Sequence, residues 1–213
     1  MDIGLSHTLE SPSMAAKSMS AKPMNELERR ICDAEEELRG VQQRLRELHQ
    51  AMPEQEVEDY RFDTPEGEVR LSALFGRHQE LLLVHNMGSG CPYCTLWADG
   101  FNGMLPHFEN RAGFAVISKD PPEAQRNFAR SRGWRFRMAS AERSPFTKDM
   151  GFESDGYPMP GVSTFRKDLA GRITRKTRAG FSPGDLYCSL WHLFDLLPFG
   201  AEGRDGWHPR FHY

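Results

Sequence analysis

The sequence lacks a long apolar run, a basic excess and a secretory signal. Its apolar runs, such as residues 81–84, are far shorter than the ~20 residues of a membrane span. Residues 1–13 lack the basic and apolar regions of a signal peptide, so we expect a cytoplasmic protein without membrane attachment. The formal net charge of −3 is not the basic excess typical of nucleic-acid binding, so we expect no nucleic-acid partner.

Cysteine is also scarce, with four residues among 213. This number is too small for a disulfide scaffold in a chain of this length. In a reducing compartment such cysteines are more often catalytic, metal-binding or without a role. Cys91 and Cys94 are the closely spaced pair, whereas we expect Cys32 and Cys188 only to fill space in packed structure.

Charge and pattern change near residue 60. Residues 24–59 carry a net charge of −6, whereas residues 60–213 carry +3. Residues 1–23 are rich in Ser, Met, Lys and Ala without periodicity, which is typical of a disordered segment. We therefore expect a disordered lead (1–23), an amphipathic heptad helix (24–55) and one folded domain (56–213).

The expected long helix carries a heptad seam. Its apolar residues alternate at spacings of four and three: Leu27, Ile31, Ala34, Leu38, Val41, Leu45 and Leu48. Asn25 and Glu28 predict a capping box at its start, and Pro53 marks its end. A stripe this narrow indicates either packing on the chain's own domain or a parallel or antiparallel pair with a second copy. We expect a homodimer through residues 27–48.

The remaining chain alternates strands and helices. The expected strands are residues 60–62, 68–71, 81–85, 113–118, 134–139, 162–167 and 172–178, and the expected helices are 91–110, 121–132 and 182–197. Pro106 is expected to bend or break the first of these helices. This order predicts an α/β fold with a mixed central sheet flanked by helices.

Cys91 and Cys94 enclose a Cys-Pro-Tyr-Cys motif between an expected buried strand and an expected helix. A CxxC in this context predicts a redox motif. Cys91 is expected at the helix N-terminus, where free N–H groups and the helix dipole stabilise a thiolate. Pro92 suits the first helical turn and keeps Cys91 extended. We therefore expect Cys91 to attack a disulfide and Cys94, one turn further on, to resolve the mixed disulfide.

The motif and its surroundings resemble known families. Cys-Pro-Tyr-Cys resembles the active-site tetrapeptide of glutaredoxins, and residues 65–76 resemble the segment before the motif in the peroxiredoxin-like branch of the thioredoxin superfamily. Further segments resemble a bacterial family filed as a domain of unknown function and described as thioredoxin-like, predicted dithiol–disulfide oxidoreductases: residues 87–103, 132–136, 160–168 and 206–213. The resemblance covers about residues 60–213 and implies a thioredoxin-like α/β sandwich, which follows the long helix expected from the heptad seam.

The candidate site extends beyond the two cysteines. Gly90, Pro92 and Tyr93 are expected to shape its entrance. Trp97 is expected to be a core or lining aromatic, or alternatively a platform for substrate. Asp99 is expected to be a solvated or capping carboxylate, or alternatively the acceptor of the Cys94 proton.

A second chain segment is expected to face the sulfurs. Thioredoxins place a cis-proline opposite their motif, and here Pro160 and Val162 are the two candidates for that position. We favour the backbone at Gly161–Ser163 as the edge that faces the cysteines. His85 is expected to be a core histidine, or alternatively a base near Cys91.

Residues near the C-terminus carry weaker signals. Residues 182–185 are interpreted as a helix capping box, or alternatively as a loop for a glutathione carboxylate. The basic residues of 166–178 are interpreted as a solvated strand face, or alternatively as a surface for an acidic partner or glutathione. Cys188 and His192 complete a possible Cys₃His zinc set with the motif, but a core helix is favoured and no metal is expected.

These features together predict a thiol–disulfide oxidoreductase acting on protein or small-molecule disulfides. We expect no bound cofactor and a supply of electrons from a thioredoxin or glutathione system. Two alternatives stay open. One is a thiol peroxidase of the peroxiredoxin-like type, and the other is a non-catalytic module that binds partners or senses redox state.

Overall fold

The computed structural model describes residues 24–212. The chain divides into two units, residues 1–50 and 51–213, and each is described here by itself. The expected lead, residues 1–23, lies outside the described residues. Within the described part of the chain, no helix combines the length and apolar character needed to cross a membrane.

The first unit contains helix α1 (Glu26–Ala51). The helix begins at the expected capping box, because the backbone N–H of Asn25 donates to the Glu28 carboxylate at 2.7 Å and the N–H of Glu28 donates to Asn25 Oδ1 at 2.9 Å. No residue of α1 is buried. Cys32, which we expected to fill packed space, is exposed.

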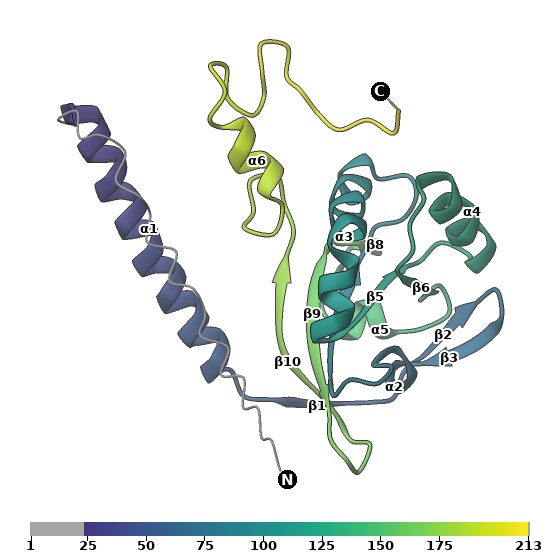
Figure 1. Cartoon of the computed structure of the whole chain (residues 1–213). Coiled ribbons are helices and arrows are strands. Elements are labelled where there is room, and N and C mark those ends of the chain that lie inside the picture. The colour runs from purple at the N-terminus through teal and green to yellow at the C-terminus, as the bar shows by residue number, and fades with distance from the viewer. Residues whose placement is uncertain (1–23, 213) are drawn as a thin grey trace, which may run out of the picture. The chain divides into compact units, whose positions relative to one another are not determined.

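The second unit is built on an eight-stranded sheet with the order β1-β10-β9-β4-β5-β6-β2-β3 (Figure 1). Its strands are β1 (Gln55–Val57), β2 (Arg61–Thr64), β3 (Gly67–Arg70), β4 (Glu80–His85), β5 (Gly113–Ser118), β6 (Arg137–Ser140), β9 (Gly161–Lys167) and β10 (Ile173–Gly180). The central strands β4, β5 and β6 are parallel, whereas β9 runs antiparallel to β4. A separate short hairpin consists of β7 (Glu153–Ser154) and β8 (Tyr157–Pro158).

Hydrophobic clusters lie on both faces of this sheet. Leu81 and Leu83 of β4 join one cluster, to which helices α2 (Leu71–Leu74) and α5 (Phe146–Asp149) contribute. Val84 joins the other cluster, to which α3 (Pro92–Arg111), α4 (Pro122–Arg132) and α6 (Ser189–Phe194) contribute. Alternate residues of a strand point to opposite faces, so a continuously apolar β4 buries both. The fold is the expected thioredoxin-like α/β sandwich with a long N-terminal helix.

Helix α3 continues through Pro106 to Arg111, so the proline does not break the helix. Leu105 and Phe108 pack into the hydrophobic cluster on either side of the proline, and this packing offsets the hydrogen bond that proline cannot make. The strand expected at residues 134–139 begins only at Arg137, because Trp134 and Phe136 pack in the aromatic cluster. Strand β1 and the β7–β8 hairpin were not anticipated.

The helix expected over residues 182–197 is much shorter in the structure. Asp185 forms a turn, because its carboxylate accepts the backbone N–H groups of Ser182 at 2.9 Å and of Tyr187 at 2.7 Å. Helix α6 begins only after Cys188 and ends at Phe194. Four leucines in this segment are spaced as in a core helix, but the structure leaves them exposed or half-buried: Leu186, Leu190, Leu193 and Leu197. Trp191 is the residue through which this helix packs.

Candidate active site

Cys91 is the N-cap of helix α3. Its backbone is extended (φ −104°, ψ 107°), and Pro92 occupies the first helical turn, as the sequence suggests. The backbone N–H of Cys94 donates to Cys91 Sγ at 3.2 Å. The Cys91 sulfur therefore replaces the capping oxygen usual at a helix N-terminus, where orphan N–H groups favour a negative charge.

The two sulfurs are electrostatically unequal. The Cys94 thiol donates a hydrogen bond to Cys91, and this bond, with the backbone N–H groups of Cys94 and Tyr93, lowers the pKa of Cys91 to about 6 against a smaller effect of burial. The same hydrogen bond and burial raise the pKa of Cys94. Cys91 is half-buried, whereas Cys94 is buried and its sulfur accepts the backbone N–H of Met87 at 3.4 Å. At neutral pH the arrangement holds one accessible thiolate beside one buried thiol.

The loop between β4 and Cys91 rests on a carboxylate that sequence reasoning missed. Asp120 Oδ2 accepts the backbone N–H of Ser89 at 2.7 Å. Gly88 has a φ of +108°, and a Cβ added there would lie 2.6 Å from Asp120 Oδ1. The carbonyl of Gly88 accepts the backbone N–H of Cys91 at 3.1 Å. Asp120 is thus linked to the position of Cys91 through two adjacent residues.

Asp120 is itself fixed by buried polar groups from three elements. Ser140 Oγ donates to the Asp120 carbonyl at 2.7 Å, and Ser118 Oγ accepts the Asp120 backbone N–H at 3.2 Å. Gln125 Nε2, from α4, donates to Ser118 Oγ at 2.8 Å and to the carbonyl of Ala139 at 3.1 Å. Buried polar groups satisfied in this way hold a single geometry. Local sequence patterns could not reveal the contact between Asp120 and Ser89, since the two residues are far apart in the sequence.

Aromatic side chains form the wall beside the motif. Tyr93 lies 6.1 Å from Trp191 in a stacked arrangement, and Trp97 stacks on Phe181 at 6.0 Å. Trp97 is only 4% exposed, so it is a core side chain in this structure. Gly90 is exposed and has open space around its Cα, which leaves the side of Cys91 that precedes the helix uncovered.

Asp99 anchors neighbouring elements. Its carboxylate pairs with the Arg132 guanidinium and accepts the indole N–H of Trp134 at 2.8 Å. These contacts join α3 to the end of α4 and give the carboxylate a structural task.

His85 lies on the sheet face opposite α3, stacked 3.9 Å from Phe152, with its Nε2 2.9 Å from Ser163 Oγ. Burial lowers the pKa of His85 to about 3, and the side chain is a neutral core histidine.

The second expected segment lies at the end of β4 that leads into the motif. Gly161 pairs with His85, and Val162 pairs with Val84. A Cβ at Gly161 would lie 2.2 Å from the Phe152 ring and 2.4 Å from the carbonyl of Ala179, so this position accommodates only glycine. Pro160 precedes β9 with a trans peptide bond, since no cis bond occurs in residues 24–212.

The remaining candidates have partners elsewhere in the chain. Cys188 is half-buried, and His192 Nε2 lies 2.8 Å from the carbonyl of Asp185. Among residues 24–212, no group of three or more His, Cys, Asp or Glu side chains is placed to hold a metal. The basic residues of β9 and β10 contact acceptors within the chain: Arg166 pairs with Glu54, Lys167 reaches the carbonyl of Ser72, and Arg178 reaches that of Met150.

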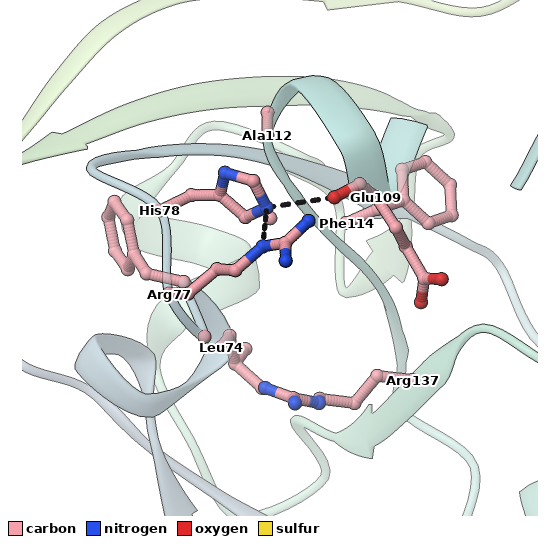
Figure 2. Close-up of a pocket in the computed structure, with 10 residues that line it drawn as sticks. Leu74, Arg77, His78, Glu109, Ala112, Phe114 and Arg137 are labelled. Atoms are coloured by element: carbon pink, nitrogen blue, oxygen red, sulfur yellow. Dashed lines mark hydrogen bonds between the residues drawn. The ribbon is translucent and has the colours of Figure 1, made fainter. Parts of the chain in front are cut away.

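A pocket of about 270 Å³ lies away from the dithiol (Figure 2). It is lined by Arg77, His78, Glu109, Arg137 and residues at the start of β5, and His78 Nε2 lies 2.8 Å from the carbonyl of Glu109. Cys91 follows the carboxyl end of β4, whereas this pocket lies at the amino end of the parallel strand β5. No residue of the expected site lines it.

The fold and the dithiol define a thioredoxin-like protein with a CxxC at the start of a helix. The chain belongs to DUF899, a family of bacterial proteins of unknown function, whose model matches residues 15–212. A search of curated proteins finds no match.

Solved structures similar to this chain include peroxiredoxins and a peroxiredoxin-like protein. Peroxidoxin BcpB from Mycobacterium tuberculosis is 25% identical with a TM-score of 0.46, and the match covers 57% of this chain and 82% of that one. Reduced Prx3 from Vibrio vulnificus, in complex with hydrogen peroxide, is 16% identical with a TM-score of 0.48, covering 64% and 88%. A peroxiredoxin-like protein from Aquifex aeolicus is 20% identical with a TM-score of 0.43, covering 61% and 72%.

Proposed function

We propose that the chain is a dithiol–disulfide oxidoreductase in which Cys91 attacks and Cys94 resolves. The observation that supports this most is the inequality of the two sulfurs. Cys91 is half-buried at a helix N-terminus with a pKa of about 6, and Cys94 is buried with a raised pKa. A dithiol that only packed or bound a metal would not need this division.

The reaction consists of two exchanges. The Cys91 thiolate attacks one sulfur of a substrate disulfide, forms a mixed disulfide and releases the other substrate sulfur as a thiolate. Cys94 then loses its proton to solvent or to the departing thiolate and attacks Cys91 Sγ. The protein becomes the Cys91–Cys94 disulfide, and the substrate leaves as two thiols. Two electrons from a thioredoxin or glutathione system restore the dithiol.

Placement of the motif suits a disulfide substrate. The open space at Gly90 leaves Cys91 accessible, and the backbone at Gly161 and Val162 lies at the same end of β4. In our proposal, Tyr93 and Pro92 shape the entrance and the 160–162 backbone faces the substrate. No bound cofactor takes part, since thiol exchange needs none.

The test is trapping of mixed disulfides, with both single variants made in the full chain. Cys94→Ser should accumulate a stable mixed disulfide with a model protein disulfide such as insulin, because attack proceeds and resolution cannot. Cys91→Ser should trap nothing, and Cys188→Ser should behave as wild type. Trapping by Cys91→Ser would reverse the assigned roles.

A thiol peroxidase would use the same thiolate differently. Cys91 would attack a peroxide oxygen, so that the O–O bond breaks, an alcohol or water leaves and Cys91 becomes a sulfenic acid. Condensation of this sulfenic acid with the Cys94 thiol would then form the disulfide and release water. Rapid loss of thiols with peroxide, together with slow reduction of insulin, would select this reaction. Failure of both assays would leave a module that binds or senses without catalysis.

A further inference from the structure

We propose that the apolar seam of α1 is the interface between two copies of the chain, with the two helices antiparallel. The described helix has no buried residue. Leu45 is half-buried, and the other large seam side chains are between 44% and 62% exposed: Leu27, Ile31, Leu38, Val41 and Leu48. A seam of this length requires apolar cover, because an isolated helix gains little stability without it.

The period of the seam specifies a helical partner. The apolar spacings alternate between four and three across residues 27–48. A straight α-helix drifts about 20° per heptad from this repeat, so a strict repeat matches a partner helix that supercoils around it. A second copy supplies a helix with the identical repeat.

The charge distribution specifies the orientation. Residues 26–37 hold six acidic and two basic side chains, a net charge of −4, whereas residues 38–51 hold three arginines and one glutamate, a net charge of +2. A parallel pair would place the two acidic halves, each with a net charge of −4, beside each other. An antiparallel pair places the acidic half of each copy beside the basic half of the other, with its net charge of +2.

The positions that flank the seam follow the same division. In the first half the flanking positions carry a net charge of −2, and in the second half they carry +1: Glu28, Arg30, Glu35 and Glu37, then Arg44. Side chains at such flanking positions set partner choice and orientation in helix pairs. Unlike net charges meet in an antiparallel pair and like net charges meet in a parallel one, which favours the antiparallel pair.

The first experiment is sedimentation velocity of the full chain over a range of concentrations and salt. We expect a dimer whose dissociation constant rises between about 0.05 M and about 0.5 M salt, because salt screens the attraction between unlike halves. A dissociation constant that falls with salt would overturn the antiparallel orientation. A monomer at every concentration, which packing on the chain's own second unit would produce, would overturn the dimer.

Charge variants test the orientation independently of salt. Arg46→Glu changes the net charge of residues 38–51 from +2 to 0, so an antiparallel pair loses the attraction between unlike halves and the dissociation constant should rise several-fold. Glu47→Lys should lower the dissociation constant. A parallel pair predicts a tighter dimer for the first variant and a weaker dimer for the second.

Seam variants test the interface itself. Leu38→Lys lies at the centre of the seam and should give a monomer, whereas Gln43→Lys lies off the seam and should leave the dimer intact. Equal effects of the two variants would overturn the seam as the interface. Because α1 lies in a different unit from the dithiol, the thiol reactivity of Cys91 in each variant checks that the second unit remains folded.

Discussion

Gly88→Ala should destabilise the protein strongly, although it adds only one methyl group, at a buried position of the loop between β4 and α3. The φ of +108° at Gly88 is a conformation that alanine rarely adopts, and holding it there costs about 1–3 kcal/mol. The new Cβ would also lie 2.6 Å from Asp120 Oδ1, so the carboxylate must move away from the Ser89 N–H. Weakening that charged hydrogen bond adds about 1.5–3 kcal/mol.

The expected loss is therefore about 2.5–6 kcal/mol, a large part of the ~5–15 kcal/mol stability of a typical domain. Gly90→Ala is the matched control, because its Cβ meets nothing within 4 Å and its φ is not positive. Alanine at such a site is expected to be neutral or to stabilise by about 0.4–1 kcal/mol.

Urea denaturation of both variants, followed by tryptophan fluorescence, measures the difference. A second background separates the two causes. The Asp120→Ala variant has no carboxylate for the new Cβ to meet. In that variant, Gly88→Ala should therefore lower the free energy of unfolding by at least about 1 kcal/mol less than it does in the wild-type protein. A Gly88→Ala variant within about 0.5 kcal/mol of wild type would refute the reasoning, as would equal losses at Gly88 and Gly90.

Two further predictions concern titratable groups near the site. Buried His85 stays neutral in the folded protein down to a pKa of about 3 but binds a proton near pH 6.5 when unfolded, so stability should fall as pH drops from 6.5 towards 3, by up to about 1.4 kcal/mol per pH unit. His85→Leu should flatten that slope in urea titrations, and an unchanged slope would refute the assignment. Asp99→Asn should cost about 1–3 kcal/mol through its contacts with Arg132 and Trp134, while the rate of mixed-disulfide resolution stays the same. A slower resolution step in stopped-flow assays would instead make Asp99 the acceptor of the Cys94 proton.

Local signals predicted the start of α1 and the strand and helix that carry the site. Asn25 and Glu28 are three residues apart, so their capping box is legible in the sequence and the structure confirms it. The continuously apolar β4 and the proline after Cys91 likewise fixed where the strand ends and the helix begins. Both signals depend on neighbours within one turn, which is the range over which sequence patterns are informative.

Contacts between distant residues could not be predicted in this way. Gly88 suggests only a turn in the sequence, whereas the structure explains it by the Asp120 carboxylate. The helix expected from Ser182 failed for a related reason. Its leucine spacing suggested a buried face, but Asp185 bonds the backbone into a turn and leaves Leu193 exposed. The spacing of apolar residues alone does not reveal whether another part of the chain packs against them.

The most direct test of the central claim is the pH dependence of alkylation at Cys91 and Cys94, followed for each cysteine by mass spectrometry. With a pKa of about 6, Cys91 should be about 90% thiolate at pH 7, whereas a free cysteine near 8.5 is about 3% thiolate. Iodoacetamide should therefore modify Cys91 with a midpoint near pH 6 and leave Cys94 unmodified throughout the neutral range. Equal rates at the two cysteines, or a Cys91 midpoint near 8.5, would contradict the proposed division into an attacking thiolate and a resolving thiol.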